Sequence, residues 1–184
     1  MDMPIVPGTH RLGPKNGKLR IETKRSGAAA KAGHDLEIEV ASWEGSLSID
    51  HDRGEISLEL NADTGSMHVT KGTGGVMALS EDDKVEIKKT LESEVLKAGE
   101  VEFKSTQVRA SNDGRRLEVS GELNMNGGHH PLHLELEVAP DGQVSGQATL
   151  KQSDWGIKPY SGLFGTLKVR DEVLVTGEAK LPAR

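Results

Sequence analysis

The chain has 184 residues, 34% hydrophobic and 28% charged, which is enough apolar material for one folded core and too little for a membrane-embedded protein. Its formal net charge of −6 argues against nucleic acid as a partner, because nucleic-acid-binding proteins concentrate Lys and Arg against the phosphates. The absence of cysteine excludes disulfides, thiolate nucleophiles and cysteine metal sites.

The N-terminal segment is rich in proline and glycine and lacks the basic start and apolar run of a secretory signal. No later window approaches the roughly 20 apolar residues that cross a bilayer, so no integral membrane segment is expected. We therefore expect a flexible leader over residues 1–17, a single domain over residues 18–182 and a cytoplasmic location.

Strand signals begin at Leu19, because Leu19, Ile21 and Thr23 alternate with charged residues. Apolar residues then fall on even positions from 36 to 40 and on odd positions from 43 to 49. A one-residue slip would turn every later side chain to the other face, so a bulge or sharp bend is predicted between Ala41 and Ser42.

Further alternating runs at 56–60, 117–125 and 132–138 predict additional strands. Turn residues at 52–54, 112–114, 126–128 and 140–142 separate these runs and favour hairpins. Glycines 45, 121, 146 and 177 fall within strand patterns, where a missing side chain eases strong bending. The pattern is typical of a closed antiparallel barrel.

One segment, Ser80 to Leu96, has a helical period, with Ile87, Leu91 and Val95 four residues apart. Ser80 is a candidate N-cap with Asp83 as its capping-box acid, and Gly99 is a candidate terminator. The apolar stripe is narrow, so we expect one amphipathic surface helix on the outside of the barrel.

Motifs for chemistry are weak, and neither a metal nor any other cofactor is expected. On a strand, His130 and His133 of the His-His-Pro-Leu-His segment would face opposite sides, which favours exposed histidines over a metal site. The Gly72–Gly75 run lacks the Lys-Ser or Lys-Thr of a phosphate loop. Asp82 and Asp83 suit a helix first turn, and His34 beside Asp35 is at most a weak acid–base candidate.

The segment from Gln152 to Tyr160 contains one of the two tryptophans and the only tyrosine. It is either a packed loop that closes one barrel end or a cavity mouth, where Lys158 or Tyr160 meets the polar head of a ligand. The sequence does not decide between these two interpretations.

Several motifs, in order, resemble the YceI-like family of small lipocalin-like barrels associated with polyisoprenoids and other amphiphilic lipids. The similar stretches cover about residues 19–180. They are Gly33-His34-Asp35-Leu36, Ser42-Trp43-Glu44-Gly45, Leu47-Ser48-Ile49-Asp50, Val101-Glu102-Phe103-Lys104-Ser105, Leu117 to Pro131, Trp155-Gly156-Ile157 and Val169-Arg170-Asp171-Glu172-Val173. The resemblance implies a mainly β fold, an eight-stranded antiparallel barrel that holds one long apolar ligand in its lumen.

The leading hypothesis is therefore a non-enzymatic protein that sequesters or carries an isoprenoid or fatty-chain lipid by burying its tail, with a homodimer possible. Because aromatic residues make up only 3% of the chain, mainly aliphatic side chains should line the lumen. The candidate ligand-binding residues are Leu36, Ile38, Val40, Trp43, Leu58, Leu60, Phe103, Leu123, Met125, Leu134, Leu136, Trp155, Lys158, Tyr160 and Phe164.

Two other hypotheses remain open. A barrel with a filled core would be a ligand-free module whose helix or loops contact a partner protein. An enzyme acting on a lipid inside the barrel would use His34 or Tyr160 as its acid or base.

Overall fold

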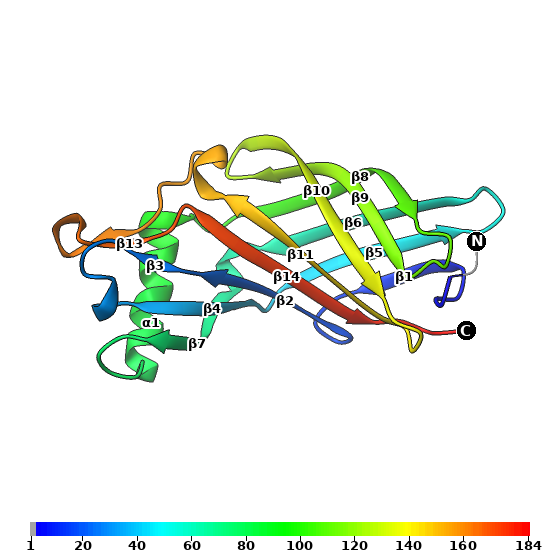
Figure 1. Cartoon of the computed structure of the whole chain (residues 1–184). Coiled ribbons are helices and arrows are strands. Elements are labelled where there is room, and N and C mark those ends of the chain that lie inside the picture. Colours follow the sequence, from blue (N-terminus) through cyan, green and yellow to red (C-terminus); the bar gives the residue numbers. More distant parts are fainter. Residues whose placement is uncertain (1–2) are drawn as a thin grey trace.

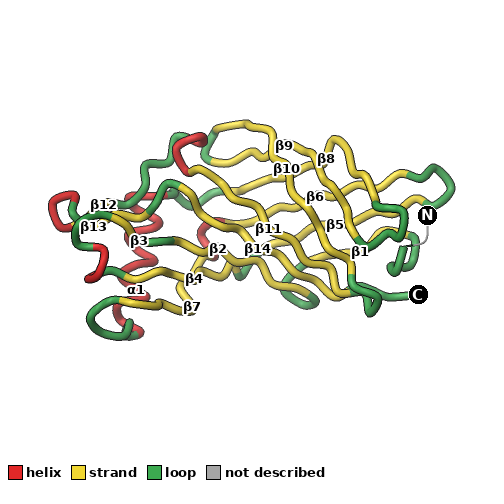
Figure 2. Tube along the Cα trace, in the orientation of Figure 1, coloured by secondary structure: helices red, strands yellow, loops and turns green. Residues whose placement is uncertain are grey.

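The structure is a computed structural model that describes residues 3–184, and it is mainly β with a single α-helix (Figure 1, Figure 2). Among these residues, no helix is both long and apolar enough to span a membrane. The strands are β1 (Gly8–Leu12), β2 (Gly17–Thr23), β3 (Arg25–Ser26), β4 (His34–Val40), β5 (Trp43–Asp50), β6 (Glu55–Asp63), β7 (Met67–Gly74), β8 (Glu100–Ala110), β9 (Arg116–Met125), β10 (Gly128–Val138), β11 (Gln143–Lys151), β12 (Ser161–Gly162), β13 (Leu167–Val169) and β14 (Glu172–Lys180).

The main sheet is antiparallel and curls into a half-barrel. Its 11 strands follow the order β1-β5-β6-β8-β9-β10-β11-β14-β2-β4-β7, and β12, β13 and β3 form a separate three-stranded sheet. In the described residues no ladder joins the two end strands, β1 and β7. The expected closed barrel of eight strands is thus wrong in strand count and in closure, although the mainly β, antiparallel class is confirmed.

A bend in the first long hairpin explains part of the extra strand count. β4 ends at Val40 and β5 begins at Trp43, so the predicted bend at Ala41 and Ser42 is confirmed. Opposite it, the short 3-10 helix η2 (Thr64–Ser66) separates β6 from β7. The hairpin therefore splits into two ladders, β4 with β7 and β5 with β6, which lie toward opposite ends of the strand order.

The N-terminal segment differs from the expected leader. β1 pairs with β5 from Gly8 opposite Ile49 to Leu12 opposite Gly45, and Ile5 is completely buried. The proline and glycine content suggested flexibility, but the apolar side chains of Met3 and Ile5 pack into the core beside Leu181. Within the described residues, the sheet thus begins well before residue 18.

The four predicted hairpin turns all lie between neighbouring antiparallel strands. Between β9 and β10, Asn126 (φ 52°) and Gly127 (φ 74°) both adopt positive φ, which a two-residue hairpin turn requires and which Asn and Gly tolerate best. Turn chemistry therefore sets this hairpin locally.

The helix α1 (Glu81–Thr90) begins as predicted, with Ser80 and Asp83 forming a reciprocal capping box. It continues into a π-helical turn, η3 (Leu91–Val95), and the chain is extended from Leu96. α1 crosses the strand direction at the end of the half-barrel away from both termini (Figure 1). The helix therefore covers this end and does not merely lie along the outside, because its stripe packs on the inner side chains of β4 and β7.

Candidate functional site

An apolar cavity of about 270 Å³ lies inside the half-barrel. Nearly all of its walls are aliphatic, in agreement with the low aromatic content of the chain. Side chains come from most strands of the main sheet and, at one end, from Leu91, Val95 and Leu96 of the helical segment. The cavity is therefore built by the whole curled sheet together with the helix that covers its end.

The cavity contains most of the residues that alternation and resemblance selected. The ten that line it are Ile38, Val40, Trp43, Leu58, Leu60, Phe103, Leu123, Met125, Leu134 and Leu136. These residues lie at inward positions of β4, β5, β6, β8, β9 and β10, so the period of two placed them on the correct face.

Five selected residues do not line the cavity. Leu36 packs beside the inner cluster of β4 and β7. Trp155 is buried in the core, where its indole N–H donates to the carbonyl of Leu123 at 3.3 Å and its ring meets His130 edge-on. Lys158 is exposed, Tyr160 is half-buried and Phe164 is fully exposed in a loop. Trp155, Lys158, Tyr160 and Phe164 lie outside the strands, where a strand period cannot predict the position of a side chain.

The segment around Trp155 is the packed loop of the two sequence interpretations. The 3-10 helix η4 (Gln152–Trp155) is held by Asp171, whose carboxylate accepts from the backbone N–H of Ser153 at 2.8 Å and from its hydroxyl at 2.5 Å. These hydrogen bonds hold the pKa of Asp171 below its usual value. The loop thus closes against the core, and Gln152 and Ile157 reach the cavity from it.

Sequence reasoning missed further lining residues. They are Leu12, Leu19, Ile21, Thr23, Leu47, Ala62, Thr64, Met67, Leu91, Val95, Leu96, Val101, Leu132, Val144, Ala148, Leu150, Ile157, Val173 and Val175, with parts of Ser145, Gly146, Gln147, Gln152, Gly177, Glu178 and Ala179. The alternation of apolar residues at Leu19 and Ile21, and at Val173 and Val175, is the sequence pattern that could have identified these positions. Leu12 lies in the segment for which the sequence predicts a flexible leader, so no strand pattern points to it.

Leucines on one side of the cavity are only half-buried although they point inward. Leu132, Leu134 and Leu136 of β10 belong to this group. β10 pairs with β11 only from Glu135 to Val138, and the two strands diverge beyond that point (Figure 1). Side chains of both diverging strands, including Ala148 and Leu150 of β11, line the cavity. The part of the cavity wall between β10 and β11 therefore lacks ladder hydrogen bonds beyond Glu135.

One polar atom in the wall lacks a partner. Thr23 is 8% exposed and lines the cavity, and its Oγ1 makes no hydrogen bond with a described residue. Thr64, another lining threonine, differs because its hydroxyl bonds the carbonyls of Lys97 and Gly99 at 3.1 and 3.0 Å. Buried hydroxyls are normally satisfied, so Thr23 offers a free hydrogen-bonding group to a ligand.

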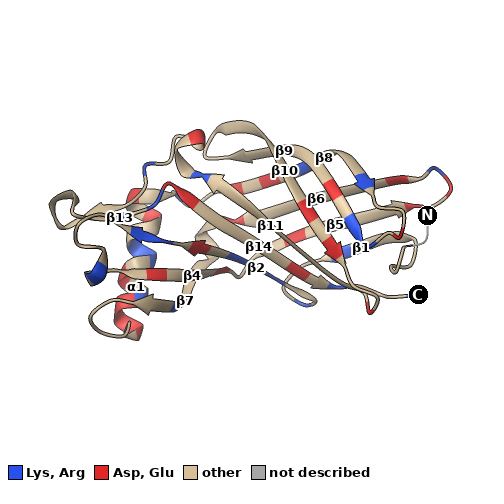
Figure 3. Cartoon of the chain, viewed as in Figure 1, with Lys and Arg blue, Asp and Glu red and all other residues tan. Residues whose placement is uncertain are grey.

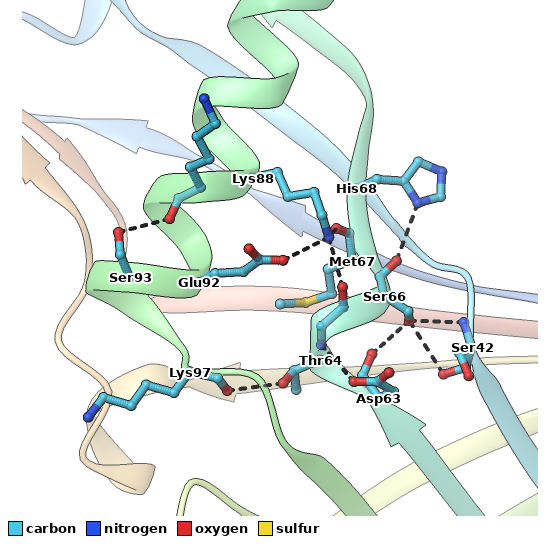
Figure 4. A network of polar contacts seen from close by, with 12 residues as sticks. Ser42, Asp63, Thr64, Ser66, Met67, His68, Lys88, Glu92, Ser93 and Lys97 are labelled. Carbon is cyan, nitrogen blue, oxygen red and sulfur yellow. Dashed lines mark hydrogen bonds and ion pairs between the residues drawn. The ribbon is translucent and has the colours of Figure 1, made fainter.

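A polar network fixes the helix over the cavity (Figure 4). Lys88 donates through Nζ to the carbonyls of Gly65 and Met67 at 2.7 and 2.9 Å and pairs with Glu92 at 2.9 Å. Ser66 meanwhile links η2 to the bend, accepting from the backbone N–H of Ser42 at 2.9 Å. The helix is thus attached to η2, and η2 to the bend between β4 and β5.

The histidines and the proposed acid–base residues lie elsewhere. His129 contacts Glu122 and Asn124, and the His133 ring bonds Ser120 at 2.9 Å. No group of three potential metal ligands occurs within residues 3–184. The ring of His34 bonds the carbonyl of Met77 at 2.7 Å, and neither His34 nor Tyr160 lines the cavity.

Asp35 ties the loop after β2 to β4. Burial opposes its ionisation, but a 2.9 Å hydrogen bond from the backbone N–H of Arg25 and the charges of Lys24 and Arg25 outweigh this and lower its pKa. Asp35 is therefore a structural anion beside the cavity end that α1 covers.

Comparison with known proteins gives a family and a fold. The family model described as YceI-like domain matches residues 18–181. BcnA of Burkholderia cenocepacia superposes with a TM-score of 0.63 at 15% identity, covering 88% of this chain and 94% of that one. A mutant YceI protein of Campylobacter jejuni gives 0.50 at 13% identity, covering 65% of this chain and 70% of that one.

A domain of Saccharophagus degradans, described as polyisoprenoid binding and implicated in plant cell wall breakdown, gives a TM-score of 0.48 at 10% identity, covering 95% of this chain and 99% of that one. No curated protein sequence matches this chain.

Proposed function

This chain belongs to the YceI-like family, and we propose that it binds one amphiphilic lipid with a hydrocarbon tail inside the half-barrel. The observation that carries the proposal is the aliphatic cavity with a single unpartnered hydroxyl, Thr23, in its wall. The protein sequesters or carries this lipid without a catalytic step. In agreement with this, the two acid–base candidates, His34 and Tyr160, are absent from the wall.

Binding is driven by removal of the tail from water. At roughly 30 Å³ per group of the size of a water molecule or methylene, 270 Å³ has room for about nine such groups. Each buried methylene contributes about 0.8 kcal/mol, so nine contribute about 7 kcal/mol before ordering costs are subtracted. This corresponds to micromolar affinity at best.

The same volume limits the tail. Affinity should rise with each added carbon of a fatty acid up to about nine or ten and then level off. A long polyisoprenoid would place only one segment inside, and the remainder would extend through the wall where β10 and β11 diverge. Polyisoprenoid and fatty-acid-like lipids therefore remain the two candidate ligand classes.

The first experiment is native mass spectrometry of the purified protein, followed by solvent extraction and identification of any bound lipid. We expect near one lipid per chain, and the same spectrum reports whether the protein is a homodimer. A protein that arrives bare and ignores added fatty acids and isoprenoids would favour the filled-core interaction module.

A matched pair of variants makes the result specific. Leu134→Trp places a large side chain into the cavity and should abolish lipid binding while the protein stays folded. Leu174→Trp makes the same change at a β14 position that does not line the cavity, and it should leave lipid binding intact. Equal loss in both variants would contradict a cavity site.

We further propose a cytoplasmic location and no enzymatic turnover. Cell fractionation tests the first. For the second, any lipid identified by extraction should be recovered unchanged after prolonged incubation with the protein, and a modified lipid that depends on His34 or Tyr160 would refute it.

A further inference from the structure

Three loops meet at the end of the half-barrel that α1 covers, opposite both termini (Figure 1). They comprise residues 24–34, 71–80 and 158–170, and we call them together the tip. Pairing of β13 with β3 joins the first and third loops, as does a 2.9 Å bond from the N–H of Ala29 to the carbonyl of Thr166. The bond between His34 and the carbonyl of Met77 joins the first and second. The tip is therefore one connected surface.

Large apolar side chains are exposed on this surface. Of the six large hydrophobic residues that are exposed within the described chain, four lie in the tip: Val76 (83%), Met77 (78%), Leu163 (56%) and Phe164 (109%). Isolated exposed apolar residues are normal, but two pairs on connected loops indicate a contact surface.

The backbone that presents one pair is unfavourable for its residues. Leu163 (φ 48°) and Phe164 (φ 55°) are consecutive bulky residues in the left-handed region, within the short 3-10 helix η5 (Leu163–Gly165). Bulky side chains rarely adopt this conformation because it crowds Cβ. The fold holds both residues in this conformation and leaves them exposed, so contacts within the protein do not compensate for the backbone strain.

Charge on the tip is opposite to that of the whole protein (Figure 3). Its three loops contain no Asp or Glu, and their seven basic residues are Lys24, Arg25, Lys31, Lys71, Lys158, Lys168 and Arg170. With 7 of the 23 Lys and Arg residues here, 16 remain beside all 29 acidic residues in the rest of the chain. The tip is a basic surface on an acidic protein.

Nearby acids neutralise only part of this charge. Asp35 pairs with Lys24 at 3.5 Å and with Arg25 at 3.9 Å. Glu81, Asp82 and Asp83 follow the second loop in the first turn of α1, where Asp83 is occupied with Ser80. Lys31, Lys158, Lys168 and Arg170 have no ion pair with a described residue.

We propose that the tip docks onto the surface of a bilayer that contains anionic phospholipid. Leu163, Phe164, Val76 and Met77 enter the headgroup region, and the basic residues contact the phosphates. Exposed apolar groups together with basic charge are the two features that hold a protein at such a surface. This inference goes beyond the cavity, because docking does not depend on what the cavity holds.

Vesicle flotation tests the proposal with phosphatidylcholine vesicles, with or without phosphatidylglycerol. We expect binding only with phosphatidylglycerol, and weaker binding at high ionic strength. Lys31→Glu combined with Lys168→Glu should weaken binding more than about 25-fold, since each lost basic residue counts for about fivefold and reversal adds repulsion. Lys15→Glu, in the β1–β2 connection at the other end, should have little effect.

The apolar contribution is tested with Leu163→Asn and Phe164→Asn together. Asn tolerates positive φ, so the melting temperature should hold or rise, while vesicle affinity falls about tenfold or more. Val6→Asn, at an exposed position at the opposite end, is the control. Wild-type protein that stays free of anionic vesicles would overturn the proposal, as would tip variants that bind like the wild type.

If the Leu163→Asn, Phe164→Asn variant unfolds, the Lys31→Glu, Lys168→Glu variant still tests whether the tip binds anionic vesicles. Leu134→Trp is expected to lose lipid from the cavity yet bind vesicles normally, so failure of docking and failure of lipid binding are distinguishable.

Discussion

Two parts of the half-barrel interior are packed differently although neighbouring strands supply both. Ile5, Leu117 and Val119 are almost completely buried in the core and do not line the cavity. Leu134 and Leu136, the cross-strand partners of Val119 and Leu117, line the cavity and are only half-buried. The first part is a filled core that stabilises the fold, and the second is packed less tightly around the cavity.

This difference reconciles two of the sequence hypotheses. A filled barrel and a barrel with a cavity were alternatives for the whole molecule, and the half-barrel contains both a filled core and an apolar cavity. In the filled core, side chains pack directly against the backbone of a neighbouring strand. A Cβ on Gly121 would lie 2.6 Å from the ring of Phe103, so only glycine lets that ring lie against β9.

The largest expected effect compares a position in the filled core with a position that lines the cavity. Leu117→Ala removes a fully buried side chain and should lower the free energy of unfolding by about 3–4 kcal/mol. Leu134→Ala, beside the existing cavity, should cost about 1 kcal/mol because less packing is lost. Urea denaturation of both variants measures this, and equal losses would contradict the comparison.

A smaller effect is expected where the helix is fastened over the cavity. Lys88→Met removes the hydrogen bonds to Gly65 and Met67 and should cost about 1–2 kcal/mol, a value reduced by partial exposure. A bound lipid should also dissociate faster, measured by stopped-flow displacement. Lys89→Met changes the neighbouring lysine, whose partner is Glu86 on the same helix, and should do neither.

Thr23→Val removes the unpartnered hydroxyl and conserves shape. Without ligand, the variant should be as stable as the wild type or up to about 1 kcal/mol more stable, because a buried unsatisfied group is lost. Fatty-acid affinity should nevertheless fall severalfold if the ligand head bonds this hydroxyl. Titration calorimetry checks this, with Thr149→Val, an exposed β11 position, as the control. Unchanged affinity would place the ligand head elsewhere.

The smallest expected effect is the loss of the stabilising contribution of Asp35 at low pH. The pKa of Asp35 in the folded protein lies below the unfolded value of about 3.9, so its ionised form stabilises the fold above that pH. This contribution is lost as pH falls through the folded pKa. Hydrogen exchange at the Arg25 amide should therefore accelerate in acid, relative to the Leu117 amide. With Asp35→Asn, acceleration should already be present near neutral pH, and an unaltered profile would contradict the role of Asp35.

Much of the candidate site was predictable because strand alternation is local. Ten of the fifteen selected residues line the cavity, and they share inward positions on strands whose period of two is visible in the sequence. Phe164 failed for a different reason. Its hydrophobicity suggested the interior, but two consecutive left-handed residues in a loop turn it outward, and no period encodes such a turn.

By itself, the sequence determined the antiparallel class, the hairpin turns, the bend at Ala41 and Ser42, and the capped start of α1, because each depends on residues within a few positions of one another. Only the tertiary structure decided that residues 8–12 form an edge strand, that α1 covers an open end, that β10 and β11 diverge, and that three distant loops form a basic and apolar tip. These features result from pairing and packing between segments far apart in the chain. A local sequence pattern does not specify which distant segment a strand or loop will contact.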